Sequence, residues 1–108
     1  MPDALLVLTT CPDADTAARL AHALVDERLA ACVNRLPGII STYRWEGRVE
    51  EASEVQLLIK TTPARFDALA TRIAALHPYA VPELVALDIT VALPAYLTWL
   101  HQCVTPDR

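Results

Sequence analysis

The most constraining feature of this sequence is a long run of alternating side chains on either side of a short turn at Glu46-Gly47. Before the turn, Tyr43 and Trp45 share one parity with the other odd-numbered residues of segment 39–45, and after it apolar and polar residues alternate through 49–60. This pattern predicts two antiparallel strands of roughly 14 residues each, spanning roughly 45 Å. We expect a kink or bulge at Pro37-Gly38 in the first strand.

The segments before this hairpin predict one strand and one helix. Leu5–Leu8 is a short apolar run closed by Thr9, Thr10 and Pro12, which is typical of a buried strand. A helix is expected from Asp13 onwards, because Asp and Thr side chains there can cap it and apolar residues then recur at helical spacing.

The segments after the hairpin predict a second helix, a strand and a final helix. Thr62 as N-cap and Pro63 at the first helical position begin the second helix, which ends at His77-Pro78. A strand over 84–91 is expected to turn its odd-numbered residues to the core, and a short helix begins near Pro94. These core-facing positions are Val85, Leu87, Ile89 and Val91.

The order β-α-β-β-α-β predicts an α+β, ferredoxin-like fold in which one antiparallel sheet carries two helices on one face. The 108 residues suit a single domain, 1–108. Two short helices cannot cover a hairpin of this length, and an exposed ribbon carrying Tyr43 and Trp45 is an aggregation hazard. The chain is therefore expected to form an oligomer in which neighbouring subunits cover the ribbon.

Charge and cysteine content narrow the function. The net charge of −4, without a Lys/Arg cluster, disfavours a nucleic-acid partner. The N-terminal apolar run is too short for a signal peptide or membrane span, and the odd set Cys11, Cys32 and Cys103 suggests reduced thiols; we expect a cytoplasmic protein. Neither a glycine-rich phosphate loop nor a nucleophile–base pair is apparent, so a binding protein is favoured over an enzyme.

Several motifs, in one order from the first strand to the last helix, resemble the CutA divalent-cation tolerance family. They are Ala31-Cys32-Val33-Asn34, Pro37-Gly38, Ser41-Thr42-Tyr43-Arg44-Trp45-Glu46-Gly47, Glu54, Lys60-Thr61, His77-Pro78-Tyr79-Ala80-Val81-Pro82-Glu83 and Tyr96-Leu97-Thr98-Trp99. The resemblance implies a homotrimer of PII-like architecture, in which the long hairpins of the subunits pack against neighbouring subunits. It also implies a cytoplasmic role in tolerance of copper and other divalent metals.

The resemblance also implies a copper site made of His77, Glu83 and a soft ligand from the end of the first strand. The family's cysteine falls at Thr9 here, and Cys11 lies on the same strand face roughly 6 to 7 Å further on. Imidazole, thiolate and carboxylate together suit copper. His77 is better suited to capping the carbonyls at the end of the helix than to contacting a metal. Glu83 is equally suited to pairing with a cation such as Lys60 or Arg44.

A second set of candidates concerns a small ligand. Tyr43 and Trp45 suit either a ligand cleft or an interface between subunits. In the PII-like alternative, Lys60 and Tyr79 would help to bind a small anionic ligand in clefts between subunits.

Overall fold

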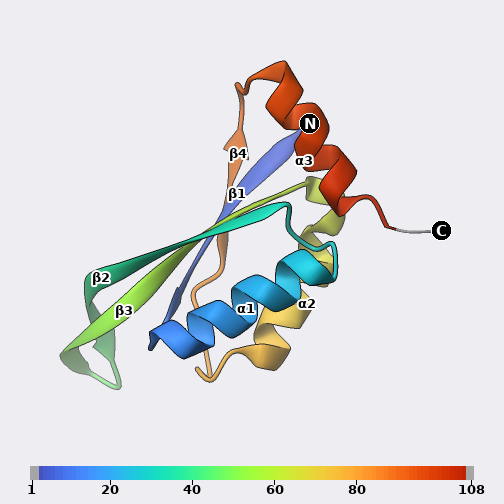
Figure 1. Ribbon diagram of the computed structural model, residues 1–108. Coiled ribbons are helices and arrows are strands. Elements are labelled where there is room, and N and C mark those ends of the chain that lie inside the picture. Colours follow the sequence, from blue (N-terminus) through green and yellow to red (C-terminus); the bar gives the residue numbers. More distant parts are fainter. Residues whose placement is uncertain (1–2, 107–108) are drawn as a thin grey trace.

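The computed structural model describes residues 3–106, in which strands and helices follow the predicted order (Figure 1). The strands are β1 (Ala4–Cys11), β2 (Cys32–Trp45), β3 (Arg48–Thr61) and β4 (Val85–Ile89). The helices are α1 (Ala14–Asp26), α2 (Phe66–Leu76) and α3 (Pro94–Val104). The strands form one antiparallel sheet in the order β2-β3-β1-β4, which confirms the predicted α+β fold.

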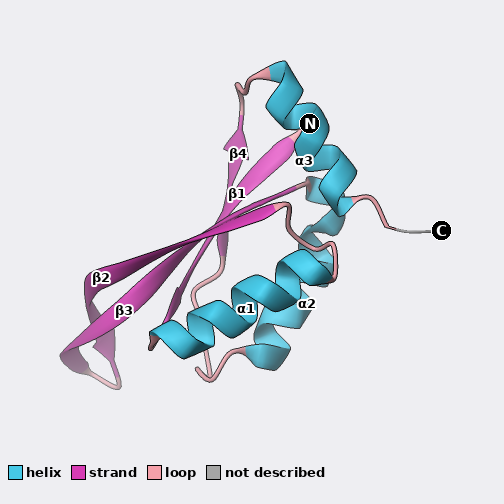
Figure 2. Cartoon of the chain, viewed as in Figure 1, coloured by secondary structure: helices cyan, strands magenta, loops and turns pink. Residues whose placement is uncertain are grey.

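Helices α1 and α2 lie together against one face of the sheet (Figure 2). On that face the odd-numbered residues of β1 and β3 pair across the ladder, with Val7 opposite Ile59. They pack on the apolar stripes of both helices, and the fully buried members include Val7, Leu20, Leu24, Leu57, Ile59, Leu69 and Ile73. Helix α1 begins as predicted, because the Asp13 side chain accepts a 2.7 Å hydrogen bond from the Thr16 amide.

The start of the second helix differs from the prediction. Pro63–Arg65 form a 3-10 turn, and α2 follows only from Phe66. Thr62 has the extended backbone of an N-cap but its side chain makes no capping hydrogen bond. The helix ends at Leu76, as the His77-Pro78 pair predicts, because the residue before a proline avoids helical geometry.

The expectation that Val85 and Leu87 face the core is wrong for the single chain. Both pair with even-numbered residues of β1, on the sheet face that α1 and α2 leave open, and each is about half exposed. The strand is also shorter than expected, ending at Ile89. Alternation with a period of two separates the side chains of a strand into two faces but does not indicate which face the helices cover. For this reason the sequence pattern assigns Val85 and Leu87 to the wrong face.

Helix α3 closes only one end of that open face. Leu100 and Val104 pack with Ala4 and Ala31 in a small cluster separate from the main core. Most of the open face is left uncovered within the chain. Across residues 3–106, no helix is both long and apolar enough to cross a lipid bilayer.

The hairpin has the predicted length, with 14 residues in each strand, and projects beyond the helices (Figure 1). The molecule is 45 Å along its longest axis. Its turn has positive φ at Glu46 and Gly47, the geometry of a type I′ hairpin. The predicted bulge at Pro37-Gly38 is confirmed, because Leu36 pairs with Gln56 whereas Ile39 pairs with Glu54. Gly38 has φ +79°, which only glycine adopts without strain.

Candidate functional site

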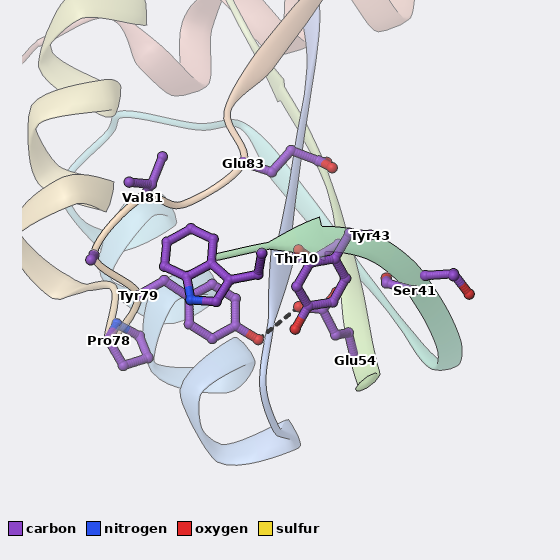
Figure 3. Close-up of a pocket in the computed structure, with 11 residues that line it drawn as sticks. Thr10, Ser41, Tyr43, Glu54, Pro78, Tyr79, Val81 and Glu83 are labelled. Atoms are coloured by element: carbon purple, nitrogen blue, oxygen red, sulfur yellow. Dashed lines mark hydrogen bonds between the residues drawn. The ribbon is translucent and has the colours of Figure 1, made fainter. Parts of the chain in front are cut away.

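A cavity of about 710 Å³ lies where the ribbon, the end of β1 and the loop after α2 meet (Figure 3). Its lining combines aromatic rings, hydroxyl groups and two carboxylates. The lining residues are Thr10, Ser41, Thr42, Tyr43, Trp45, Glu54, Pro78, Tyr79, Ala80, Val81 and Glu83. This volume is typical of a small-molecule site, and we call the cavity the ribbon pocket.

The bulge decides which ribbon side chains reach this pocket. Before the bulge, even-numbered residues of β2 pair with even-numbered residues of β3. After it, odd-numbered residues of β2 pair with even-numbered residues of β3, as Tyr43 does with Glu50. Paired residues share a sheet face, so the extra residue brings Tyr43 and Trp45 to the side of Glu54. The alternation in the sequence placed these two rings on one face, and the structure places both in the pocket wall.

Glu54 is the most constrained charged group of the pocket. Its side chain is 7% exposed, and the Tyr79 hydroxyl donates a 2.7 Å hydrogen bond to its Oε2 (Figure 3). Burial raises the pKa of Glu54, but hydrogen bonds from the hydroxyls of Ser41, Tyr79 and Thr10 outweigh it, so the pKa is lowered overall. At neutral pH the pocket therefore contains a buried carboxylate anion.

Tyr79 experiences the opposite effect from the same contact. Burial raises the pKa of Tyr79, and the hydrogen bond to Glu54 and the charge of Glu54 raise it further. The phenol thus stays protonated and remains a donor to the carboxylate. In Figure 3, Tyr79 from the loop and Tyr43 from the ribbon both approach Glu54, so two distant segments meet at this residue.

His77 fixes the loop that carries Tyr79. It is buried, and its Nε2 lies 2.7 Å from the carbonyl oxygen of Thr10, while Nδ1 accepts a 3.1 Å hydrogen bond from the Tyr79 amide. Nδ1 is therefore unprotonated and Nε2–H donates to Thr10. Both ring nitrogens are engaged, and the ring bonds to β1 instead of capping the carbonyls of α2.

Cys11 does not join His77 and Glu83. Its side chain is fully buried in the core that α1 and α2 cover, and Thr9 is buried on the same strand face. Burial, followed by the charges of Asp13 and Glu54, raises the pKa of the Cys11 thiol to about 11. Among residues 3–106, no three His, Cys, Asp or Glu side chains are grouped to hold a metal ion. Within one chain, the three predicted ligands do not form one site.

The other candidates divide between the pocket and the far end of β3. Glu83 is exposed and lines the pocket. Lys60 instead donates a hydrogen bond to the Asn34 side chain. Lys60 lies six residues along β3 from Glu54, which places it roughly 20 Å from that carboxylate. Arg44 donates to the Gly47 carbonyl at 3.4 Å. Neither cation lines the pocket.

Three residues of the pocket are not predicted from the sequence, namely Glu54, Ser41 and Thr10. Glu54 could have been identified from the sequence, since it belongs to the even-numbered, polar residues of its strand and lies opposite the bulge. Its partner Tyr79 lies 25 residues away, and no local pattern connects the two. Four of the candidate residues line this pocket. Tyr43, Trp45 and Tyr79 are the candidates for a ligand cleft or an interface, and Glu83 is a candidate for metal binding.

Comparison with known proteins agrees with the motifs. Residues 5–103 match the model of the CutA1 divalent ion tolerance protein family. The chain belongs to this family. The CutA divalent-cation tolerance protein of Thermus thermophilus is 53% identical over 97 residues, which are 90% of this chain and 94% of that relative. Protein CutA of Mus musculus is 46% identical over 93 residues, 86% of this chain and 52% of its own.

Solved CutA structures share the fold as well. CutA from Xylella fastidiosa superposes with a TM-score of 0.93 at 50% identity, covering 95% of this chain and 99% of that one. The chain thus shares both sequence and fold with CutA proteins over nearly its whole length. The bacterial relative above is named as a tolerance protein and not as an enzyme.

Proposed function

We propose that this protein acts in tolerance of divalent cations as a cytoplasmic homotrimer, and that it takes up the cation through the carboxylates of Glu54 and Glu83. The observation that carries the proposal is the buried, ionised Glu54 in a pocket that Glu83 also lines. Glu54 accepts hydrogen bonds from the hydroxyls of Tyr79, Ser41 and Thr10, and because a carboxylate has about four lone-pair sites, one remains for a cation.

Copper is the divalent ion that we propose as the first to test, because sites of nitrogen and oxygen ligands generally bind Cu²⁺ more tightly than the other first-row divalent ions. The Cys11–His77–Glu83 set does not fit this geometry. Cys11 is a protonated thiol in the core, and His77 would have to give up its hydrogen bond from the Tyr79 amide. We therefore assign His77 to positioning the loop and Glu83 to contacting the ion.

The trimer is supported by the uncovered sheet face. Leu36, Val85 and Leu87 are 41–49% exposed there, and the ribbon extends past the helices that cover the rest of the sheet. An apolar sheet face of this kind is stabilised by burial against another subunit. We propose the PII-like arrangement, in which three copies cover one another's open faces and ribbons.

The small anionic ligand of the PII-like alternative is not favoured by this pocket. Its lining contains Glu54 and Glu83 and, among the described residues, no Lys or Arg. A carboxylate or phosphate would meet like charge at short range, which costs binding free energy. The pocket is suited to cations.

Isothermal titration with Cu²⁺ tests the proposal. Glu83→Gln and Glu54→Gln should each weaken copper binding by about tenfold or more, since even outer contacts of metal sites contribute that much. Asp26→Asn, at an exposed carboxylate on α1, is the matched control and should bind like the unaltered protein. A loss of copper binding in Cys11→Ala together with unchanged binding in Glu83→Gln would overturn the assignment.

A further inference from the structure

The ribbon pocket is far larger than an ion requires. Its 710 Å³ falls in the range of sites that enclose small organic molecules. Metal ligation at Glu54 and Glu83 uses oxygen atoms and leaves the aromatic part of the lining without a role. Tyr43, Trp45 and Tyr79 contribute three rings to a pocket that has only two acidic groups.

No Lys or Arg lines the pocket beside the carboxylate of Glu54 among the described residues 3–106. The donors to this carboxylate are the neutral hydroxyls of Tyr79, Ser41 and Thr10. The hydroxyl donors keep Glu54 ionised, but they are neutral and leave its negative charge unpaired with any Lys or Arg of the pocket lining. A cationic ligand in the pocket would therefore be attracted to this carboxylate.

The rings indicate which kind of cation fits. Aromatic faces are attracted to cations through their quadrupole, and this attraction is strongest for ammonium groups that shed water easily. A small hydrated metal ion gains little from such faces, whereas an alkylated amine gains contact with both the rings and the carboxylate. Tyr43 and Trp45 are 44% and 47% exposed within the single chain and both line the pocket, so a ligand inside the pocket can contact their rings.

The ring positions are built into the fold. The bulge at Gly38 turns Tyr43 and Trp45 to the pocket side of the ribbon, and His77 anchors the loop that brings Tyr79 to Glu54. Aromatic walls from two separate segments thus converge on one buried anion. We propose that the ribbon pocket binds a small organic cation, an alkylated amine or quaternary ammonium, with Glu54 facing the charge and the rings of Tyr43, Trp45 and Tyr79 enclosing the alkyl groups.

This inference adds a ligand class to the proposed function and shares Glu54 with it, but it does not require metal binding. The two are separated by titrating the organic probe in the presence of EDTA and the metal in the absence of the probe. If copper fails to bind and the probe binds, only the metal assignment is lost. If copper binds through Glu54 and Glu83 and the probe does not bind, only the organic cation is lost.

The probe is tetramethylammonium chloride, with tert-butanol as a neutral molecule of similar size. The chain has two tryptophans, of which Trp45 lines the pocket while Trp99 packs against the tilted ring of Tyr96 in α3. In ¹H–¹⁵N spectra of the intact protein, the indole signal of Trp45 should shift with saturation, and that of Trp99 should stay in place. Tert-butanol at equal concentration should produce no saturable shift.

Two variants test the roles of charge and rings separately. Glu54→Gln keeps the shape of the side chain and should weaken tetramethylammonium binding by about tenfold, and Trp45→Leu should weaken it by several fold. Asp26→Asn changes the net charge equally and should leave binding unaltered. Because Trp45 is exposed, its replacement tests the pocket even if Glu54→Gln does not fold. A Trp45 signal that never saturates, or equal responses to the ammonium and the alcohol, would overturn the proposal.

Discussion

The hydroxyl of Tyr79 donates a 2.7 Å hydrogen bond to Oε2 of Glu54, and so connects the loop after α2 to β3, the second strand of the ribbon. The bond stabilises both partners in the protonation states found at neutral pH, since the pKa of Glu54 is lowered and that of Tyr79 is raised. Together with the contact between His77 and the Thr10 carbonyl, this bond holds the loop against the sheet.

Removing the Tyr79 hydroxyl should lower the stability of the fold and make the carboxylate of Glu54 easier to protonate. Tyr79→Phe leaves the ring in place but deprives a buried carboxylate of a donor, so the free energy of unfolding should fall by about 1–3 kcal/mol. The pKa of Glu54 should rise, because one hydrogen bond to its charged form is lost. Urea denaturation measures the first effect and ¹³C titration of the carboxyl the second. Tyr96→Phe is the control and should leave the Glu54 pKa unchanged.

The contribution of Glu54 to stability should disappear in acid. Its folded-state pKa lies below the ordinary value of 4.5, so its ionised form stabilises the fold above that pH, and the stabilisation is lost as the pH falls through the folded-state pKa. The difference in unfolding free energy between the unaltered protein and Glu54→Gln should therefore be greatest near pH 7 and shrink below pH 4.5. Denaturation series at several pH values test this. A difference that stays constant down to strongly acidic pH would contradict it.

Cys11 should resist alkylation in the folded protein. Its thiol is fully buried and burial raises its pKa to about 11, so little thiolate is present or accessible at pH 8. Iodoacetamide followed by peptide mass mapping should leave Cys11 unmodified in native protein and label it fully in guanidinium. Rapid native labelling of Cys11 would show that it is not part of the core.

The proposed trimer should depend on the open sheet face. Leu87→Glu places a charge on that face and should shift the protein from trimer to monomer in sedimentation velocity, because an unpaired buried charge is costly. Val25→Glu alters a residue of similar exposure on α1 and should leave the trimer intact. If both variants remain trimeric, the open face of β4 is not part of the interface.

Substitutions of Gly38 should destabilise the protein through backbone strain and not through steric clash of the new side chain. A Cβ at this position would meet nothing within 4 Å, yet φ is +79°. Gly38→Ala should therefore lower the free energy of unfolding by about 1 kcal/mol, Gly38→Asn by less and Gly38→Val by more, following their tolerance of left-handed geometry. Thermal or urea unfolding of the three variants gives the order. Equal losses in all three would point to a cause other than φ.

Local sequence patterns predict the order of the elements and the length of the hairpin, and the Pro37-Gly38 pair predicts the bulge, because these depend on neighbours in sequence. Such patterns were not sufficient for Val85 and Leu87, whose alternation is clear but whose face depends on where α1 and α2 pack. Cys11 is a different case. It shares parity with Val7, so the strand pattern already contained the evidence that its thiol belongs to the core.

The pocket itself depends on contacts that no local pattern encodes. The ring of His77 meets Thr10 across 67 residues, and Tyr79 meets Glu54 across 25. The His-Pro-Tyr motif identified the loop as important through family resemblance. It did not indicate that the histidine holds the loop while the tyrosine and a distant glutamate form the site.

The bulge lets β2 carry one residue more than β3 without misaligning the ribbon. Leu36 pairs with Gln56 and Ile39 with Glu54, so both lie on one sheet face although they are three positions apart. Deleting one residue between them would restore the ordinary two-residue spacing and leave Ile39 opposite Glu54, so Tyr43 and Trp45 would stay on the pocket side. The bend and extra twist that a bulge gives its strand would be lost instead. The extra residue therefore sets the direction in which the ribbon leaves the sheet, while the pairing sets the face that its rings occupy.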